Sequence, residues 1–396
     1  MAKVRLGDMA TVVTKGTTPT TIGFQFEDSG INFVKVESIS EDGTFLKEKF
    51  SHISDECNVQ MRRSQLQEND ILFSIAGAIG RSAIVTKEIL PANTNQALAI
   101  IRVPKGKIDY NYLLYALSSS AINQQATQHQ QGVAQLNISL KNVSDFLLPI
   151  YTEAMQKRIV HNLKKIDKLI FLRKQQLSKL DELVKARFVE MFGAPSDNVN
   201  NLPASPMTAI CQIIDGDRGK NYPKQEEFSD SGFCLFLNAK NVTAQGFSFE
   251  NCTYITEEKD ALLRKGKLCR GDVVLTTRGT IGNLAFYDTS VPYENIRINS
   301  GMVILRMNKQ VVSEIFFIEQ FKMQLDSIKS RIASGSAQPQ LPISTMNKIE
   351  MILPPIELQN QFAAFVERVD KQKQTVQQSL EKLELMKKAL MQEYFG

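Results

Sequence analysis

The segment Asp70–Gly80, DILFSIAGAIG, is typical of a buried strand that runs into a tight turn containing glycine. The chain repeats this pattern at Asp272–Gly282 as DVVLTTRGTIG. Further pairs follow in the same order at offsets of about 202–205 residues: FVKVESI (33–39) with FLNAKNV (236–242), HISDEC (52–57) with YITEEK (254–259), NQALAIIR (95–102) with NSGMVILR (299–306), and GVAQLNIS (132–139) with GSAQPQLPIS (335–344). Similarity at a nearly fixed offset indicates a duplicated structural unit. We therefore expect two domains of the same fold within one chain.

The segments between the glycines predict short strands, because they are rich in valine, isoleucine and phenylalanine and are bounded by glycine, asparagine and aspartate. The predicted strands are 31–36, 70–75, 82–86 and 97–103 in the first copy, and 234–239, 272–277, 283–288 and 301–307 in the second. Each copy also contains one amphipathic helical segment, at 109–125 and at 313–330. The expected fold class is α+β, with two similar mixed α/β domains.

Each predicted domain is followed by a long helical segment whose apolar residues alternate at spacings of four and three, without internal proline or glycine. This heptad pattern is typical of a coiled coil. The predicted seam residues are Ile159, Leu163, Ile166, Ile170, Leu177, Leu180, Val184 and Met191 in the first segment, and Phe362, Val366, Val369, Val376, Leu380, Leu383, Leu390 and Tyr394 in the second. Arg173, Arg187, Lys373 and Lys387 occupy polar seam positions, and each segment ends in Phe-Gly.

Pairing of the two segments within one chain requires them to be antiparallel, with the two domains at opposite ends. The alternative is a parallel coiled coil between two copies of the protein. The expected domain boundaries are 1–150 for the first globular domain, 151–193 for the first helical region, 194–352 for the second domain and 353–396 for the last helical region.

The bulk composition is that of a soluble globular protein, with 43% hydrophobic and 22% charged residues over 396 positions. No segment approaches the roughly 18–20 uncharged apolar residues of a membrane span, so a cytoplasmic location in a bacterium or archaeon is expected. Five cysteines without CxxC spacing and only three histidines give no basis for a metal site, and the cysteines are expected to be small buried residues. The net charge of +5 is concentrated in residues 153–192, which hold ten basic and five acidic side chains.

A rigid spacer with a similar domain at each end suits a ligand that has two recognition points at a fixed separation. DNA is such a ligand, since dimeric DNA-binding proteins contact half-sites about one helical turn apart. Two domains that are similar but not identical predict a split, asymmetric target.

The order of domain, junction, heptad helix, domain, junction and heptad helix resembles the specificity (S) subunit of type I restriction–modification systems over essentially the whole chain. The residues that carry the resemblance are LGDMATVVTKGTTP near the start, DILFSIAGAIGRSAIV, DVVLTTRGTIGNLAFY, GSAQPQLPIS, LPPIELQNQ and the two helices that end in Phe-Gly. The first junction, LPIYTEAMQ, departs from the family pattern, which usually has a second proline and a shorter run.

The resemblance implies two target-recognition domains, each of which recognises half of a bipartite double-stranded DNA sequence. It also implies helices that dock methyltransferase (M) subunits, with two such subunits expected, and restriction (R) subunits that join the full complex. The S subunit of that family performs no chemistry. The cofactors, S-adenosylmethionine for methylation and ATP with Mg²⁺ for restriction, would then belong to the partners.

Candidate DNA contacts follow from side-chain chemistry, because arginine can pair with guanine, asparagine with adenine, and lysine neutralises phosphate. In the second domain they are Arg218, Lys220, Asn221, Tyr222 and Lys224, followed by Asn238, Lys240, Arg278, Thr280, Asn283 and Arg297. In the first domain they are Lys15, Thr17, Thr18 and Thr20, followed by Lys35, Arg81, Asn95 and Gln96. For Asn95, Gln96 and Arg297, a capping or turn role is the alternative.

The basic face of the first long helix (Lys164, Lys165, Lys168, Arg173 and Lys174) could follow the phosphates of the spacer DNA or could be a solvated surface. The competing functions are a coiled-coil scaffold without DNA binding, and a nuclease. Glu257, Glu258 and Lys259 superficially suit a nuclease site. However, the equivalent triplet Asp55–Cys57 lacks the lysine, and both triplets follow a residue suited to cap a helix, Ser54 or Thr256. No catalytic or metal-binding residues are therefore predicted.

Overall fold

The computed structural model describes residues 2–128, 137–195, 197–333 and 340–396. The chain forms two compact units, Met1–Lys174 with Gln378–Gly396, and Gln175–Gln377. Each long helix therefore contributes one half to each unit. The predicted repeat segments 132–139 and 335–344 lie partly outside the described residues.

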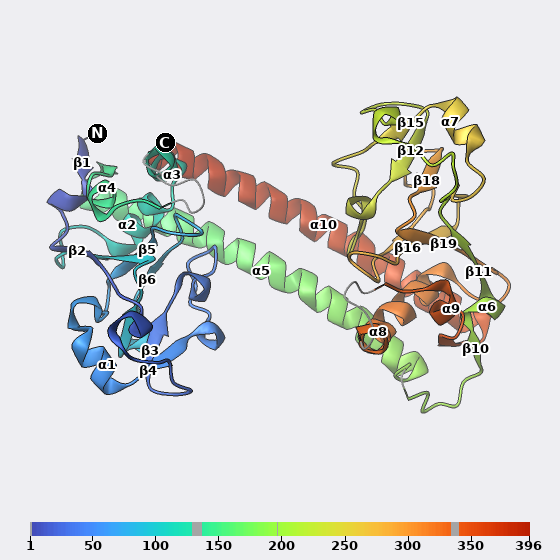
Figure 1. Cartoon of the computed structure of the whole chain (residues 1–396), viewed down its shortest axis with the longest axis horizontal. Helices are drawn as coiled ribbons and strands as arrows, with labels where there is room; N and C mark the ends of the chain where they lie inside the picture. Colours follow the sequence, from blue (N-terminus) through green and yellow to red (C-terminus); the bar gives the residue numbers. More distant parts are fainter. Residues whose placement is uncertain (1, 129–136, 196, 334–339) are drawn as a thin grey trace. The chain divides into compact units, whose positions relative to one another are not determined.

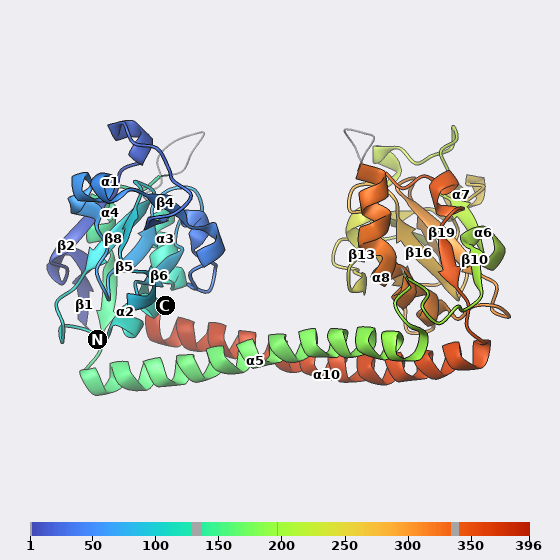
Figure 2. The ribbon, with the colours of Figure 1, turned by 90° about the horizontal axis from the view of Figure 1, so that it is seen from below.

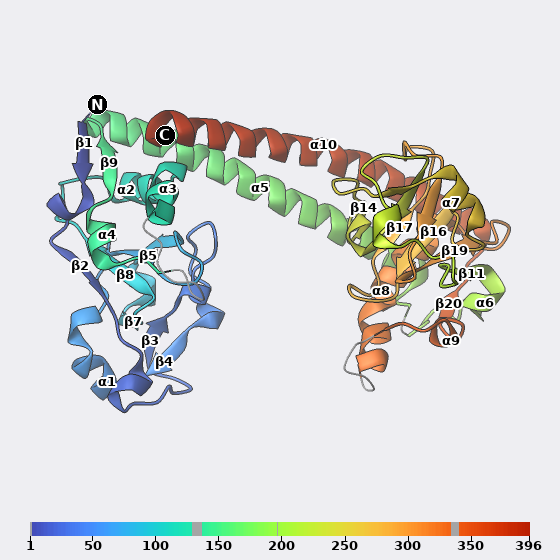
Figure 3. The ribbon, with the colours of Figure 1, turned by 45° about the horizontal axis from the view of Figure 1, so that its top comes forward.

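The first unit contains two main sheets with short helices around them (Figure 1). Its strands are β1 (Ala2–Arg5), β2 (Val12–Lys15), β3 (Ile31–Val34), β4 (Ser51–Ile53), β5 (Ile71–Ser74), β6 (Ser82–Ile84), β7 (Ala92–Thr94), β8 (Leu98–Arg102) and β9 (Leu147–Ile150). Its shorter helices are α1 (Asp55–Gln60), α2 (Tyr110–Leu117), α3 (Ser120–Gln128) and α4 (Leu140–Ser144). The sheet orders are β2-β8-β5-β6 and β4-β3-β7, and β1 pairs with β9 next to the start of the first long helix (Figure 3).

The second unit repeats this order of strands. Its strands are β10 (Ala204–Pro206), β11 (Cys211–Asp215), β12 (Cys234–Leu237), β13 (Val242–Thr243), β14 (Gly246–Phe247), β15 (Tyr254–Ile255), β16 (Asp272–Thr276), β17 (Leu284–Phe286), β18 (Ile296–Ile298), β19 (Met302–Met307) and β20 (Glu350–Ile352). Its shorter helices are α6 (Met207–Ile210), α7 (Glu257–Leu262), α8 (Glu314–Ala333) and α9 (Ile343–Met346). The sheets β11-β19-β16-β17, β15-β12-β18 and β10-β20 match those of the first unit, so the predicted duplication and the predicted α+β class are confirmed.

Alternate residues of each central strand pack against different layers, as the two-residue period of a strand requires. In β16, Val273 and Leu275 share a core with the phenylalanines of α8, which lies along the sheet (Figure 2). Val274 lies between them in sequence and packs instead with Leu235 and Ile296 of the three-stranded sheet. The four-stranded sheet is thus buried on both faces, which explains why its strands are continuous apolar runs.

The long helices are α5 (Glu153–Phe192) and α10 (Ile356–Phe395), each of 40 residues and unbroken (Figure 2). All predicted seam residues are buried or half-buried. In the first unit, the start of α5 packs with the end of α10, where Asp167 Oδ1 lies 2.6 Å from Lys387 Nζ. In the second unit, the end of α5 packs with the start of α10, where Asp181 Oδ1 lies 2.7 Å from Lys373 Nζ. The helices are therefore antiparallel in each unit, as predicted.

The phenylalanine that ends each long helix is part of a core. Phe192 is fully buried and contacts Phe188, Phe316 and Phe362 in the second unit. Phe395 lies 5.3 Å, ring to ring, from Tyr112 in the first unit. The terminal Phe-Gly therefore anchors each helix to the unit in which the helix ends.

Two expectations from the sequence were wrong. The single helix predicted over 109–125 is broken into α2 and α3 at Ser118 and Ser119, where the Ser118 hydroxyl bonds back to the Leu114 carbonyl (2.9 Å) and competes with helix continuation. Cys269 is exposed, whereas Cys57, Cys211 and Cys234 are buried as expected. In the part of the chain that the structure describes, no helix is both long enough and apolar enough to cross a membrane.

Candidate nucleic-acid interface

Strand register brings several loops together at one edge of each unit, which we call the loop edge. In the first unit, β2 and β5 end where β8 begins, since Lys15 pairs with Ala99 and Ser74 with Leu98. The parallel strands β3 and β7 also end there, at the paired residues Val34 and Thr94. The loop edge of the first unit is therefore formed by the loops after β2, β3, β5 and β7. In the second unit it is formed by the loops after β11, β12, β16 and β18, which are related by the same register.

The predicted contact residues of the first unit meet at this edge. The Thr18 hydroxyl, in the loop after β2, donates a hydrogen bond to Gln96 Oε1 in the loop after β7 (2.6 Å). Gly16 N–H bonds to the Asn95 carbonyl (3.1 Å). A Cβ atom on Gly16 would lie 1.7 Å from the Thr94 oxygen, so only glycine allows these two loops to touch.

The second unit has the same loop contact with different side chains. Arg218 Nη2, in the loop after β11, donates to the Ser300 carbonyl in the loop after β18 (3.2 Å) and pairs with Asp215 (3.2 Å). A Cβ atom on Gly216 would lie 2.4 Å from the Asn299 oxygen, which is the counterpart of the close approach at Gly16. Glycine thus fixes the loop spacing in both units, while neighbouring residues vary.

The turns that first revealed the repeat have the same backbone geometry. Gly77 and Gly279 have φ of 71° and 70°, and Gly80 and Gly282 have φ of 94° and 95°. The hydroxyl of Ser74 accepts from Arg81 N–H (2.8 Å), as the hydroxyl of Thr276 accepts from Asn283 N–H (3.0 Å).

About half of the predicted contact residues are exposed at the loop edge and could meet a ligand. They are Lys15, Thr17 and Thr20 in the first unit, and Arg218, Lys220, Lys224, Lys240, Arg278 and Thr280 in the second; Gln96 is exposed as well. These side chains offer cations and hydroxyls, the groups that bind phosphate and base edges. The DNA-contact assignment of these residues remains a prediction.

Other predicted residues have side chains that stabilise the loops themselves. The side-chain oxygens of Asn238 and Asn95 accept hydrogen bonds from the backbone N–H groups of Lys240 and Ala97. Three other side chains donate to backbone carbonyls: Asn221 to Leu262, Asn283 to Val242, and Arg81 to Ile39. The Tyr222 ring packs on Phe236 (5.8 Å), and the Lys35 ammonium lies 4.3 Å from the centre of the Phe26 ring. These side chains are half-buried, so contact with a base would require them to leave their present partners.

Arg297 does not fit the predicted contact role. Its side chain is 7% exposed and donates to the Asp260 carboxylate and to the carbonyls of Asp260, Leu263 and Lys265. Four of the five N–H donors of this buried side chain are bound within the unit, so Arg297 is not placed to contact DNA. Arg297 instead joins β18 to α7 and to the segment that follows it.

The triplet that superficially suited a nuclease has a structural role. Thr256 accepts from Lys259 N–H (3.2 Å) and caps α7, as Ser54 accepts from Cys57 N–H (3.1 Å) and caps α1. Lys259 Nζ binds both carboxylate oxygens of Glu227 (2.8 and 2.9 Å). The capping prediction is therefore confirmed.

Sequence reasoning missed Asp217 and Arg264. Asp217 is buried and accepts from the backbone N–H groups of Gly219 and Arg264 (both 2.8 Å), and these bonds lower the pKa of its carboxyl. The Arg264 side chain is 76% exposed, and its Nη2 lies 3.9 Å from Asp217 Oδ1. The repeat could have identified Arg264 as a candidate, because Arg264 aligns with Arg62 at the offset of 202 residues that relates Asp272 to Asp70.

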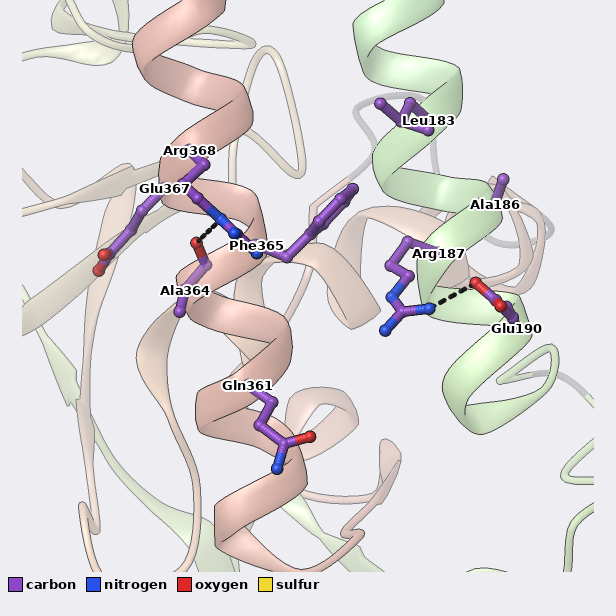
Figure 4. Close-up of a pocket in the computed structure, with 9 residues that line it drawn as sticks. All are labelled: Leu183, Ala186, Arg187, Glu190, Gln361, Ala364, Phe365, Glu367 and Arg368. Atoms are coloured by element: carbon purple, nitrogen blue, oxygen red, sulfur yellow. Dashed lines mark hydrogen bonds and ion pairs between the residues drawn. The ribbon is translucent and has the colours of Figure 1, made fainter.

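A groove separates α5 from α10 in the second unit (Figure 4). Leu183, Ala186, Arg187 and Glu190 line it from α5, and Gln361, Ala364, Phe365, Glu367 and Arg368 from α10. Arg187 pairs with Glu190 (2.7 Å), and its guanidinium carbon lies 5.9 Å from the Phe365 ring centre. Leu183 is 46% exposed, so the groove leaves apolar surface uncovered within the chain.

On the basic face of α5, Arg173 donates to Ser379 (3.2 Å), while Lys164, Lys165 and Lys168 are exposed.

The family model for the type I restriction modification DNA specificity domain matches residues 1–182 and again residues 207–385. This chain belongs to that specificity family. Both copies of the domain coincide with the structural repeat described above, so the chain has the organisation of a type I specificity subunit.

Individual relatives agree with this family. The EcoBI type I restriction enzyme specificity subunit of Escherichia coli is 33% identical over 139 residues, which is 35% of this chain but only 28% of that relative. A solved chain from a study of type I restriction–modification complex assembly and conformational transition has the same fold, with a TM-score of 0.58, 15% identity, and coverage of 100% of this chain and 97% of the other. The S subunit from M. genitalium matches with a TM-score of 0.55, 14% identity, and coverage of 100% and 96%.

Proposed function

We propose that each unit of this specificity subunit recognises one half of a bipartite, asymmetric double-stranded DNA target. The observation that carries this proposal is the loop edge. The same strands, the same glycines and the same close loop approach occur twice, while the side chains exposed there differ, as Thr20 does from Lys220. Base recognition depends on which side chains reach the groove, so one scaffold with two loop sets suits two different half-sites.

The long helices, in this proposal, space the two readers and dock two methyltransferase subunits, one at each unit, with restriction subunits joining the full complex. The groove between Leu183 and Phe365 is the surface that we assign to the methyltransferase in the second unit. Its uncovered apolar side chains suit a protein surface rather than a phosphate backbone. The chain itself would be non-catalytic, with S-adenosylmethionine bound by the methyltransferase, and ATP and Mg²⁺ by the restriction subunit.

The decisive experiment is to map methylated bases in a host genome with and without this chain, co-expressed with its methyltransferase subunits. A new split motif with two unlike halves at fixed spacing is expected. Exchange of residues 1–150 for the corresponding region of another specificity subunit should then change one half only. Methylation that does not depend on the chain would refute the proposal, and a single continuous motif would limit recognition to one unit.

The docking assignment has its own test. Leu183→Glu should reduce co-purification of the methyltransferase with the chain. Leu262→Glu, in α7 of the same unit and outside the groove, changes a leucine of similar exposure (54%, against 46% for Leu183) and should not reduce it. Equal recovery with both variants would exclude the groove.

A further inference from the structure

A short basic segment reaches the loop edge of the second unit beside β18. Leu268 N–H bonds to the Ile296 carbonyl, and Ile298 N–H bonds to the Gly266 carbonyl (both 2.9 Å). The segment therefore runs antiparallel to β18. Continuation of this register brings Arg264 level with Ser300, whose carbonyl accepts from Arg218. Arg264 and Lys265 are thus placed beside the loop that carries the predicted contact residues.

Asp217 fixes the backbone of Arg264 and leaves its guanidinium exposed. The carboxylate binds Arg264 N–H and Gly219 N–H, and it is itself only 6% exposed. A Cβ atom on Gly219 would lie 2.9 Å from Arg264 Nη2, so the guanidinium lies directly against this glycine. An arginine that is held at its backbone, lies on a glycine loop and points to solvent is well placed for an anionic ligand.

The corresponding segment of the first unit pairs in the same register and also carries two basic residues. Leu66 N–H bonds to the Ala92 carbonyl (2.9 Å), as Leu268 does to Ile296. The preceding 3-10 turn, Arg62–Ser64, lies against β2, whose end forms the loop edge. Arg62 and Arg63 are both exposed, and neither forms an ion pair within the described ranges of the chain. They occupy the positions that correspond to Arg264 and Lys265 at the offset of 202 residues.

The two basic pairs keep their charge in both units, unlike several of the predicted contact positions. Positions 20 and 220, or 35 and 238, carry different residue types in the two units, whereas 62–63 and 264–265 are basic in both. Residues that distinguish two half-sites should differ between the units, and residues that bind what both half-sites share should not. The feature common to every half-site is the phosphate backbone.

We propose that Arg62–Arg63 and Arg264–Lys265 are matched phosphate contacts, one in each unit, that supply sequence-independent affinity for DNA. This inference rests on the proposed function. Asp217 acts as a positioning residue for the contact in the second unit, since it binds backbone groups rather than the ligand.

The test measures how DNA affinity depends on salt, for the full chain in complex with its methyltransferase subunits and a duplex of arbitrary sequence. Each phosphate contact contributes about 0.9 to the slope of log K against log salt concentration. The double variant Arg264→Gln/Lys265→Gln should therefore lower the magnitude of the slope by about 1.8. Arg62→Gln/Arg63→Gln should lower it by the same amount, and the methylated sequence should stay unchanged in both.

The matched control is Lys105→Gln/Lys107→Gln, which removes two exposed charges after β8, at the opposite edge of the first unit's sheet, and should leave the slope unchanged. A slope equal to wild type in the Arg264 variant would overturn the proposal. Loss of the methyltransferase with an unchanged slope would show a protein contact instead, and a changed target sequence would show base contact. A wild-type complex that binds no DNA would refute the proposed function itself, a result distinct from any of these.

Discussion

Gln359 accepts a hydrogen bond from the backbone N–H of Ser313 (3.0 Å), which ties the start of α10 to the residue before α8. The Gln359 amide also donates to the carbonyls of Val311 and Pro354, and the side chain is fully buried. Gln156 makes the equivalent bond to Asp109 N–H (3.0 Å) before α2 in the first unit. Each long helix is thus joined to the core of a unit by one buried amide.

Gln359→Leu should lower the free energy of unfolding by about 2–4 kcal/mol, because leucine leaves buried backbone groups without partners. The measurement is chemical denaturation of the full chain. Gln372→Leu, at an exposed position of the same helix, should change stability by less than about 0.5 kcal/mol. Equal effects of the two substitutions would contradict a tie through Gln359.

Arg306 and Asp272 form a bidentate pair across β19 and β16 (2.9 and 2.8 Å), and Arg102 and Asp70 do the same in the first unit (both 2.7 Å). Arg306→Met should lower the free energy of unfolding by about 2–3 kcal/mol, because it leaves the buried Asp272 carboxylate without its cation. This is less than the loss expected for a fully buried pair, because the Arg306 side chain is 39% exposed and solvent screens the charge. Thermal unfolding provides the comparison. Arg5→Met removes a solvent-exposed ion pair and should cost less than about 1 kcal/mol.

Lys387 and Asp167 pair across the two long helices in the first unit. A double-mutant cycle with Lys387→Gln and Asp167→Asn should give a coupling energy of about 0.5–1 kcal/mol, because both side chains are about one-third exposed. Asparagine at 167 can still accept the hydroxyl of Tyr115, so the cycle isolates the charge. Coupling that does not weaken in 1 M salt would argue against an ion pair.

Gly216→Ala should separate the loops after β11 and β18, because the new methyl group would lie 2.4 Å from the Asn299 oxygen. We expect a loss of about 1–3 kcal/mol in stability and impaired recognition of one half of the target only. Methylation mapping and denaturation report the two effects. Gly106→Ala also introduces strain, at φ +80°, but has no close contact and lies away from the loop edge, so it should leave recognition intact.

Asp217→Ala should lower the free energy of unfolding by about 1–3 kcal/mol, because the backbone N–H groups of Gly219 and Arg264 lose their shared acceptor. It should also weaken DNA binding, because Arg264 is no longer held in place. Backbone hydrogen bonds lower the pKa of Asp217 in the folded state. Its stabilising effect is therefore present above the ordinary aspartate pKa and is lost only as the pH falls through the lowered value. The effect of the substitution on affinity should consequently be constant between about pH 6 and pH 8.

Local pattern was sufficient for the elements and for the duplication. The Asp70–Gly80 turn and its copy share φ angles to within a degree or so, because glycine stands at the same two positions of each turn and permits the positive φ that other residues rarely adopt. The heptads likewise identified the seam, since helix periodicity decides which side chains share a face. Ser118 and Ser119 broke a predicted helix because their hydroxyls compete with the backbone, an effect that apolar periodicity does not register.

The sequence by itself determined that one α+β scaffold occurs twice and is joined by two coiled-coil helices, because these features depend on spacing along the chain. Only the tertiary structure decided which polar side chains remain available. Arg297 and Arg278 look equally suitable in the sequence, yet Arg297 is enclosed by Asp260 and three carbonyls while Arg278 is exposed. The repeat aligns Arg264 with Arg62, but only the structure shows that Asp217, 47 residues away in sequence, holds the Arg264 backbone N–H at the loop edge. The availability of a donor depends on long-range neighbours, and no local pattern specifies them.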